Sequence, residues 1–322
     1  MKKKLLFIVP HLSTGGMPQF VLKQIEIFKD EYDISLIEWE NVTGGVYVVQ
    51  RNAIENILNN NFYSLSKNKT EMISIISDIE PDIIHFHEIP ETFVDNGLLD
   101  NLYSNERKYR IVVTTHSSLT DPSGIKYTAD RYVLVSEWSK DIFNAHFKDV
   151  ECEVWEYPIE KYEYDKDSSK EELGWNKDYK HILNVGLFTR GKNQGELFDL
   201  AREFKNEKVI FHFVGNQAIN FKEYWGPIME SIPDNCIVHG ERNDVEKFYK
   251  AADLFYFPSN FELSPLAVKE ALSYGLPTFI KNLHTYKNMY DGKVIYIEDD
   301  KFKNKKNVID CLSEVKIEFS EF

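Results

Sequence analysis

The sequence predicts an α/β protein built from two Rossmann-like domains, each with a parallel sheet. Short apolar runs alternate with amphipathic segments of helix length along most of the 322 residues. A polar stretch at residues 158–179 divides this alternation into two series. The length also suits two domains of ordinary size. We therefore expect an N-terminal domain over 1–157, a linker over 158–180, a C-terminal domain over 181–302 and a terminal helix over 303–322.

The first series supplies the elements of the N-terminal domain. Its strand-like runs are short and rich in β-branched or aromatic residues, as buried strands are. They are Lys4–Val9, Ile34–Trp39, Ile83–Phe86, Ile111–Thr115, Tyr132–Val135 and Val150–Trp155. Helical spacing is found between them at Phe20–Phe28, Met72–Ile79, Phe93–Leu102 and Trp138–Phe147. Such alternation indicates a parallel sheet with right-handed crossovers, and Ser136 is suited to cap the last of these helices.

The second series repeats this organisation after the polar stretch. Its strand-like runs are Ile182–Val185, Val209–Val214, Ile237–Val238, Leu254–Phe257, Thr278–Ile280 and Val294–Ile297. We again expect a parallel sheet, with ligands bound at the carboxyl ends of its strands. Residues 303–319 have helical character.

Composition and charge exclude several classes of protein. The net charge of −14 argues against nucleic acid as a partner, because phosphate backbones require a basic face. Residues 2–4 and 107–110 form only small basic clusters, so peripheral membrane contact is not indicated. No apolar run approaches the roughly 18 residues of a membrane helix. Residues 1–10 have too short an apolar core for a signal peptide, and three scattered cysteines are typical of a cytoplasmic protein.

Two carboxylates in the segment 255–279 suit a polyhydroxylated ligand. Glu262 precedes a predicted helix and Glu270 lies inside it, and carboxylates accept hydrogen bonds from neighbouring hydroxyls. The helix start at Ser264, Pro265 and Leu266 offers backbone amides and a positive dipole end, which suit a phosphate. Together they could bind a nucleotide sugar. A Glu pair with this spacing is also common for purely structural reasons.

The first domain offers candidate residues at the ends of its strands. Gly15 and Gly16 follow the first strand and permit close approach to a ligand. His87 ends the strand at 82–87, and Glu88 is next to it. His116 ends the next strand, at a position where open α/β sheets bind ligands. A buried structural histidine or a solvent-facing loop histidine is the alternative at these positions.

The segment 255–279 closely resembles the Glu-x7-Glu signature of retaining GT-B glycosyltransferases of the family 4 kind. The pattern includes Pro258-Ser259 before the first Glu and a Glu-Ala-Leu-x-x-Gly-Leu-Pro end at 270–277. The stretch 184–194 resembles the family's Val-Gly-Arg-x-x-x-x-Lys-Gly element, with Lys192 at the position of the phosphate-binding lysine. Leu187 replaces the usual Arg, and Arg190 is placed to supply that charge. A second departure from the family pattern lies at residues 17–19, which are Met-Pro-Gln in this chain, whereas relatives often have charged residues there.

The resemblance implies a GT-B architecture, with the two domains facing across a cleft and a hinge near residue 158. It implies that Glu270 holds the ribose, Glu262 and His116 contact the transferred sugar, and Lys192 and Arg190 hold the diphosphate. The amides of residues 264–266 join the diphosphate site, and Gly16 lies near the donor phosphate or the acceptor. The strand ends at 214–216 and 238–240 receive the nucleotide. His87, Glu88 and the loops 42–49, 87–93 and 116–126 lie on the acceptor side, and the terminal helix returns to the first domain.

We expect no metal and no cofactor besides the nucleotide-sugar substrate. His85 and His87 share a strand face, but no further ligands follow at a suitable spacing. Asp165-Lys166-Asp167 has the Asp-x-Asp spacing of metal-dependent glycosyltransferases but lies in the predicted linker.

The predicted function is retaining transfer of a sugar, first of all from a UDP-sugar, to a glycan, lipid or protein acceptor. Two alternatives stay open: a nucleotide-sugar epimerase or inverting enzyme on the same fold, and a non-catalytic glycosyltransferase-like partner subunit. The sequence does not specify the sugar, the base, the acceptor or the oligomeric state.

Overall fold

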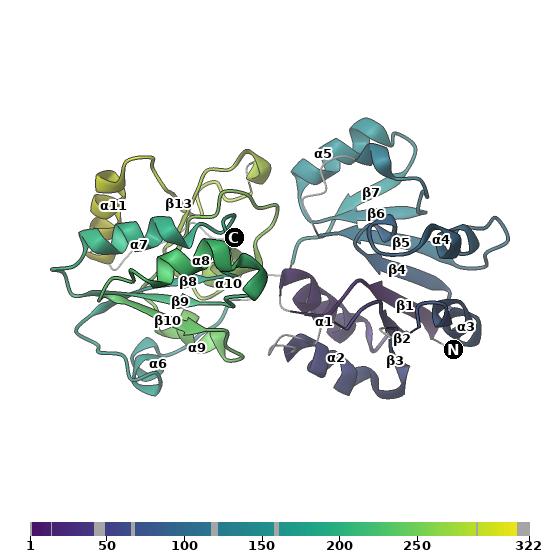
Figure 1. The fold of residues 1–322 in the computed structure, drawn as a ribbon, viewed down its shortest axis with the longest axis horizontal. Helices are drawn as coiled ribbons and strands as arrows, with labels where there is room; N and C mark the ends of the chain where they lie inside the picture. The colour runs from purple at the N-terminus through teal and green to yellow at the C-terminus, as the bar shows by residue number, and fades with distance from the viewer. Residues whose placement is uncertain are drawn as a thin grey trace. The chain divides into compact units, whose positions relative to one another are not determined.

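The structure is a computed structural model that describes residues 2–13, 15–41, 49–65, 68–116, 122–157, 161–287 and 289–313. The chain divides into two compact units, Met1–Tyr157 and Pro158–Phe322. Each unit holds one parallel sheet with helices, so the predicted α/β class is confirmed (Figure 1). The predicted hinge at residue 158 and the acceptor-side loop residues 42–48 and 117–121 lie outside the described residues.

The sheet of the first unit has seven parallel strands in the order β3-β2-β1-β4-β5-β6-β7. They are β1 Lys3–Val9, β2 Tyr32–Glu38, β3 Phe62–Ser64, β4 Ile83–His87, β5 Arg110–Thr115, β6 Arg131–Leu134 and β7 Glu151–Val154. The helices are α1 Gly16–Phe28, α2 Val49–Leu58, α3 Glu71–Ile79, α4 Asn96–Leu102 and α5 Glu137–His146, with 3-10 turns η1 Asn59–Asn61, η2 Pro90–Thr92 and η3 Pro122–Gly124.

Two of these elements, β3 and α2, were not predicted. β3 has three residues and none of them is buried, so it carries no apolar run. α2 buries only Ile54 and Leu58 among its described residues, so its apolar face is narrow. The predicted cap of α5 is present, since Ser136 accepts a hydrogen bond from the Ser139 amide.

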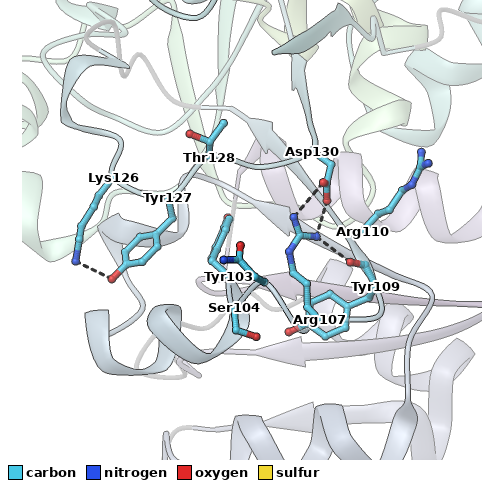
Figure 2. Close-up of a pocket in the computed structure, with 10 residues that line it drawn as sticks. Tyr103, Ser104, Arg107, Tyr109, Arg110, Lys126, Tyr127, Thr128 and Asp130 are labelled. Atoms are coloured by element: carbon cyan, nitrogen blue, oxygen red, sulfur yellow. Dashed lines mark hydrogen bonds and ion pairs between the residues drawn. The ribbon is translucent and has the colours of Figure 1, made fainter. Parts of the chain in front are cut away.

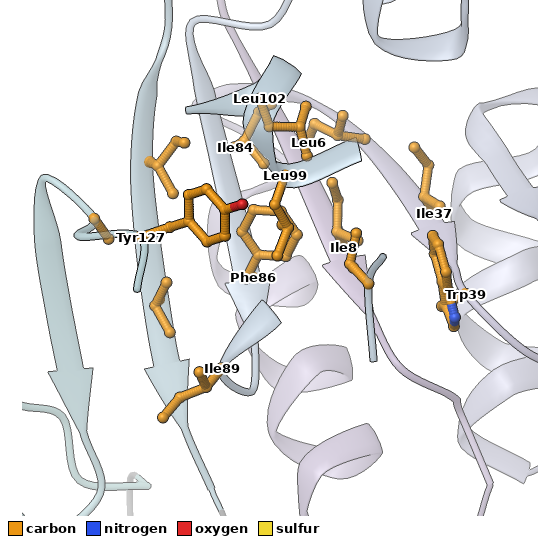
Figure 3. Close-up of a cluster of buried hydrophobic side chains, with 14 of the residues drawn as sticks. Leu6, Ile8, Ile37, Trp39, Ile84, Phe86, Ile89, Leu99, Leu102 and Tyr127 are labelled. Atoms are coloured by element: carbon orange, nitrogen blue, oxygen red, sulfur yellow. The ribbon is translucent and has the colours of Figure 1, made fainter. Parts of the chain in front are cut away.

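The core of the first unit lies on both faces of its sheet. On one face Leu6 and Ile8 of β1 pack with Phe86 of β4 and with Leu99 and Leu102 of α4 (Figure 3). On the other face the alternate β1 residues pack against α1 and α2. This burial on both sides explains why the central strands are continuous apolar runs in the sequence.

The second unit has a six-stranded parallel sheet in the order β10-β9-β8-β11-β12-β13. The strands are β8 Lys180–Val185, β9 Val209–Val214, β10 Cys236–Gly240, β11 Leu254–Phe257, β12 Thr278–Ile280 and β13 Ile295–Tyr296. The helices are α6 Lys166–Glu172, α7 Gln194–Glu203, α8 Lys222–Met229, α9 Val245–Ala251, α10 Leu266–Ser273 and α11 Lys301–Ser313, with 3-10 turns η4 Ile219–Phe221 and η5 His284–Tyr286.

The segment expected as a linker is packed on the second unit from residue 161 onward. Asp165 caps α6 by accepting hydrogen bonds from the amides of Asp167 and Ser168. Lys170 of α6 is buried and forms an ion pair with Asp253, at 2.9 Å. The Asp-x-Asp pattern therefore has a structural role as a helix cap.

The predicted terminal helix is present as α11. It lies alongside α7 in Figure 1, and its buried side chains Val308, Cys311 and Leu312 belong to a core cluster of the second unit. Residues 314–322, the rest of the segment expected to return to the first domain, lie outside the described residues. No helix in the described ranges combines the length and apolar character that a membrane span requires.

A chain of three histidines crosses the second sheet. His181 Nε2 lies 2.9 Å from the Asn176 carbonyl oxygen, and His181 Nδ1 lies 2.9 Å from His212 Nε2. His212 Nδ1 lies 2.9 Å from His239 Nε2. Because the carbonyl oxygen can only accept, neutral imidazoles must donate in sequence from His239 through His212 and His181 to Asn176. Trp175 stacks on His212, with ring centroids 3.8 Å apart.

The strand order reverses at one point in each sheet. The first strand of each series is central, and the chain then crosses to its other side, so the switch point lies between β1 and β4 and between β8 and β11. Open α/β sheets bind ligands outside the carboxyl ends of the strands at this point.

Candidate functional site

The loop that follows β8 places Lys192 at the switch point of the second unit. The Lys192 amide donates to Thr189 Oγ1 at 3.2 Å, and the Asn193 amide donates to the Thr189 carbonyl at 3.1 Å. These turns lead directly into α7, whose cap residue Asn193 has a left-handed backbone with φ 55°. Arg190 lies in the same loop and is exposed. The fold thus holds Lys192 close to the sheet and leaves Arg190 at the surface.

Lys192 forms an ion pair with Glu262, the first carboxylate of the predicted pair. Its Nζ contacts Glu262 Oε1 and lies 5.0 Å from the centre of the Phe257 ring. The side chain of Glu262 is 12% exposed and that of Lys192 is 29% exposed. The structure therefore brings together two residues that are 70 positions apart in the sequence.

Ser259 connects the loop after β11 with the loop after β8. Its hydroxyl lies 2.7 Å from Glu262 Oε1 and 3.1 Å from the Gly191 carbonyl oxygen. The Asn260 amide donates to the same carbonyl at 2.8 Å. Thr285 Oγ1 donates to the Glu262 carbonyl. These contacts fix Glu262 and Lys192 relative to each other.

The N-terminus of α10 lies in the same loop. Pro265 is the cap residue, and Leu266 is the first residue of the helix. The first amides of a helix have no intrahelical acceptor. Ser264 is half-buried and precedes the cap. The helix therefore offers amide donors and its positive dipole end beside Glu262.

Glu270 lies on α10 and is held by a tyrosine that sequence reasoning missed. Tyr249 of α9 donates from its hydroxyl to Glu270 Oε2 at 2.9 Å. Tyr249 is 2% exposed, and burial, followed by the charge of Glu270, raises its pKa well above the ordinary value. The hydroxyl therefore stays protonated and donates. Its position on a separate helix, 21 residues before Glu270, gives no spacing signal.

Three glycines meet at the carboxyl ends of β8, β9 and β10. The Gly186 amide donates to the Val214 carbonyl at 2.9 Å, and the Gly215 amide donates to the Gly240 carbonyl at 2.8 Å. A Cβ atom on Gly215 would overlap the carbonyl group of Gly186. This close approach makes the strand ends compact where a nucleotide is predicted to bind.

In the first unit, the glycine loop lies between β1 and α1. Gly16 is the first residue of α1, and Gly15 caps the helix with φ 142°, in a conformation that favours glycine. Both glycines are exposed. Behind the loop, the buried Glu38 accepts from the Leu12 amide at 3.1 Å and pairs with Arg51 at 3.0 Å. Sequence reasoning missed Glu38 and Arg51, which support the loop.

The histidines of the first unit form a buried group at the ends of β4 and β5. His87 is fully buried, and its Nδ1 lies 3.0 Å from Nε2 of the half-buried His116. His85 Nε2 lies 2.7 Å from Thr114 Oγ1. Burial lowers the pKa of His85 and of His116 to about 3 and that of His87 well below its ordinary value. All three are therefore neutral at pH 7.

Glu88 follows His87 and has an unusual backbone. Its φ is 99°, a region that residues with a side chain rarely adopt. Its amide donates to the Thr114 carbonyl at 2.7 Å, which holds this conformation beside the histidines. Strained residues of this kind cluster at functional sites.

A separate pocket of about 510 Å³ lies in the first unit (Figure 2). Arg107 and Asp130 form an ion pair at its wall, and Lys126 contacts the Tyr127 hydroxyl. Asp130 directly precedes β6, and Arg110 starts β5, so the pocket lies at the amino ends of the strands. His87 and His116 lie at or just beyond the carboxyl ends and are not part of it. Among the described residues, no group of three or more His, Cys, Asp or Glu is arranged to hold a metal ion.

The part of the second unit that holds the candidate residues also matches a known protein family. Residues 165–292, which contain Lys192, Glu262, Glu270 and Tyr249, match the family described as glycosyl transferases group 1. This segment, less than half of the chain, is similar to group 1 glycosyl transferases. Its match begins inside the segment that the sequence suggested as a linker, in agreement with the packing of α6 on this unit.

Two curated relatives are similar to parts of this chain. The UDP-Gal:alpha-D-GlcNAc-diphosphoundecaprenol alpha-1,3-galactosyltransferase of Escherichia coli is 35% identical over 101 residues, 30% of this chain and 26% of that protein. An uncharacterized glycosyltransferase of Methanocaldococcus jannaschii is 24% identical over 251 residues, 69% of this chain and 61% of that protein. The chain thus spans less than two thirds of the length of either relative.

Solved structures share the fold of both units. Anabaena Alr3699/HepE in complex with UDP and glucose has a TM-score of 0.77 and 13% identity, covering 97% of this chain and 90% of that one. The predicted GT-B architecture, as two Rossmann-like units of this fold, is therefore confirmed. The roles of the individual site residues stay predictions.

Proposed function

We propose that this chain transfers a sugar from a nucleotide-diphosphate sugar to a hydroxyl of a glycan, lipid or protein acceptor. The observation that carries the proposal is the Lys192–Glu262 pair at the switch point of a unit that is similar to group 1 glycosyl transferases. A cation for phosphate and a carboxylate for sugar hydroxyls lie there in direct contact. The transfer proceeds with retained anomeric configuration and without a metal.

Diphosphate is the leaving group, and its charge is stabilised by protein cations and amides. Lys192 is held at the sheet edge, and Arg190 is exposed in the same loop. The start of α10 adds amide donors beside them. Fixed donors aimed at developing charge are a main source of catalysis in such sites. Arg190 supplies the charge that Leu187 lacks.

Glu270 binds the ribose of the donor. Its carboxylate accepts hydrogen bonds from the two ribose hydroxyls, and the Tyr249 hydroxyl holds it through Oε2. Because Tyr249 comes from α9, the orientation of Glu270 is set by the fold of the domain.

Glu262 and His116 contact the transferred sugar. Glu262 accepts from its hydroxyls, and the neutral His116 exchanges a hydrogen bond with it. In the reaction, the bond between the anomeric carbon and the phosphate oxygen breaks as the acceptor oxygen bonds to the same face of that carbon. The acceptor proton passes to the departing phosphate, so no protein nucleophile is required.

UDP-sugars are the first donors to test. Anabaena Alr3699/HepE was solved with UDP and glucose, and the name of the Escherichia coli relative gives UDP-Gal as its donor. UDP-galactose and UDP-glucose therefore head the panel. Gly16, His87 and Glu88 are assigned to the acceptor side, where the acceptor itself is not specified.

The test is a thermal-shift panel of UDP-, GDP-, ADP- and dTDP-sugars against the wild type and Glu270→Ala. A ligand that binds only the folded state raises the melting temperature. We expect stabilisation by UDP-sugars that Glu270→Ala abolishes and that Glu246→Ala, an exposed position on α9, retains. If no nucleotide sugar stabilises the wild type, the partner-subunit alternative is favoured.

Product analysis separates the enzymatic alternatives. NMR of the product should show the anomeric configuration of the donor; inversion, or a free epimerised nucleotide sugar, would contradict the proposed reaction. Turnover should be unchanged in excess EDTA, and its loss with recovery on adding Mg²⁺ or Mn²⁺ would contradict metal independence.

A further inference from the structure

Glu262 Oε1 is shared by two hydrogen-bond donors of different chemistry. Lys192 Nζ contacts it as an ion pair, and the Ser259 hydroxyl lies 2.7 Å away. Within the described part of the chain, Oε2 of the same carboxylate makes no hydrogen bond. One oxygen is therefore fully engaged, and the other is available to a ligand.

The two donors differ in how firmly they are held. Ser259 is 1% exposed, and its neighbour Asn260 is fastened to the Gly191 carbonyl through a backbone hydrogen bond of 2.8 Å. Lys192 is more exposed and ends in a flexible four-carbon side chain. A competing anion can therefore withdraw the lysine and leave the serine in place.

A diphosphate is such an anion. It carries at least two negative charges, whereas Glu262 carries one, and Lys192 lies in a loop that leads into α7 beside the start of α10. If Lys192 turned to the phosphate without a replacement, Glu262 would lose the contact that orients its carboxylate. Ser259 supplies the second contact to the same oxygen.

We propose that Ser259 is the positioning residue for Glu262. When Lys192 leaves Glu262 to form an ion pair with the donor diphosphate, Ser259 keeps its contact to Oε1, and the carboxylate stays oriented so that Oε2 can bind the sugar. This inference rests on the proposed function. It has two consequences. In the empty site, Glu262 competes with the diphosphate for Lys192 and weakens nucleotide binding. In the occupied site, Ser259 supports turnover without contributing to nucleotide affinity.

The experiment measures UDP affinity by calorimetry and turnover of the UDP-sugar identified above, in the wild type, Ser259→Ala, Glu262→Gln and the double variant. Glu262→Gln should bind UDP about three- to tenfold more tightly, because Lys192 no longer pairs with a charged carboxylate. Ser259→Ala should bind UDP within about twofold of the wild type, while kcat falls about tenfold through the lost hydrogen bond to a charged group. In the Glu262→Gln background, Ser259→Ala should lower kcat no further, since the serine acts through Glu262.

Two controls separate positioning from general damage to the loop. Ser273→Ala removes another buried serine hydroxyl, bound to the Lys269 carbonyl at 3.0 Å, and should leave kcat and UDP affinity unchanged. Ser259→Thr keeps the hydroxyl and should retain more turnover than Ser259→Ala. If Ser259→Ala does not fold, the UDP affinity of Glu262→Gln alone tests whether Lys192 moves from Glu262 to the diphosphate. The kcat of Ser259→Thr then tests the role of the hydroxyl.

The outcomes distinguish this inference from the proposed function. Equal or weaker UDP binding by Glu262→Gln, or a parallel loss of UDP affinity and kcat in Ser259→Ala, would overturn the exchange while the glycosyltransferase assignment stands. Absence of nucleotide-diphosphate binding to the wild type would overturn the proposed function and this inference with it.

Discussion

His87 Nδ1 lies 3.0 Å from His116 Nε2, and the two rings are nearly parallel, with centroids 5.3 Å apart. His87 is fully buried, whereas His116 is half-buried at the end of β5. His87 Nε2 is buried and has no hydrogen-bond partner among the described residues. The hydrogen bond of the His87 ring within the described residues is therefore the one to His116. The buried His87 thus holds the His116 side chain in place.

Stability should fall as the pH drops below 6.5. Burial lowers the pKa of His85 and His116 to about 3 and that of His212 to about 2, below the ordinary value of 6.5. The unfolded chain therefore takes up protons between pH 6.5 and 3 that the folded chain does not. The stabilisation is complete above pH 6.5 and is lost as the pH falls. Each buried histidine should cost about 1.4 kcal/mol at pH 5.5.

Urea denaturation at pH 7.5, 6.5 and 5.5 checks this expectation. His146→Gln, a change at an exposed histidine of α5, should leave the pH dependence unchanged. A free energy of unfolding that stays level or rises between pH 7.5 and 5.5 would show that the buried histidines do not resist protonation.

Removing the His87 ring should impair turnover more than nucleotide binding. His87→Leu deletes the contact to His116, so kcat should fall about tenfold because His116, which we propose contacts the sugar, is no longer held in place. His87→Asn can place an amide near the Nδ1 position and should lose less. UDP affinity, which is assigned to the second unit, should change less than about twofold in either variant. A kcat equal to that of the wild type in His87→Leu would exclude the positioning role.

The central strands of the two sheets were predictable because they are buried on both faces. Ile182–Val185 and Val209–Val214, for example, are apolar except for Asn184 and His212, and they form β8 and β9. β3 was missed because it is short and none of its residues is buried. The other edge strands, β7, β10 and β13, were nevertheless predicted, so the place of β3 at the sheet edge does not explain why it was missed.

The site was predictable only where a local motif marks it. Lys192, Glu262 and Glu270 lie in segments with recognisable spacing, and the structure places Lys192 and Glu262 in contact. Tyr249 and Arg51 carry no such signal, since each acts through a partner on another element. Their roles depend on tertiary contacts that a single sequence does not reveal.

Gly215→Ala should destabilise the second unit strongly. The added Cβ would overlap the carbonyl group of Gly186. Because this group is backbone at a strand end, the overlap can be relieved only by moving the main chain. We expect a loss of about 2–3 kcal/mol, as for a forced backbone shift in a packed region. Gly226→Ala is the matched control, since the nearest atom to its added Cβ is Lys222 Cγ at 3.8 Å and the helix should gain up to about 1 kcal/mol. Urea denaturation of both variants measures the difference, and equal stabilities would contradict the close approach of Gly215 and Gly186.

Tyr249→Phe should weaken nucleotide binding without removing it. The substitution deletes the hydrogen bond of 2.9 Å to Glu270 Oε2 and leaves the carboxylate in place. Because that bond is made to a charged group, UDP affinity should fall about three- to tenfold. Tyr164→Phe is the matched control, since it deletes the hydrogen bond of a half-buried hydroxyl to the Tyr274 carbonyl, at 2.7 Å, and leaves the bond to the Glu270 carboxylate in place. Calorimetric titration with UDP and with uridine distinguishes the outcomes. Both ligands carry the ribose, so both should lose affinity to the same extent. A loss confined to UDP would place Glu270 at the diphosphate instead of the ribose.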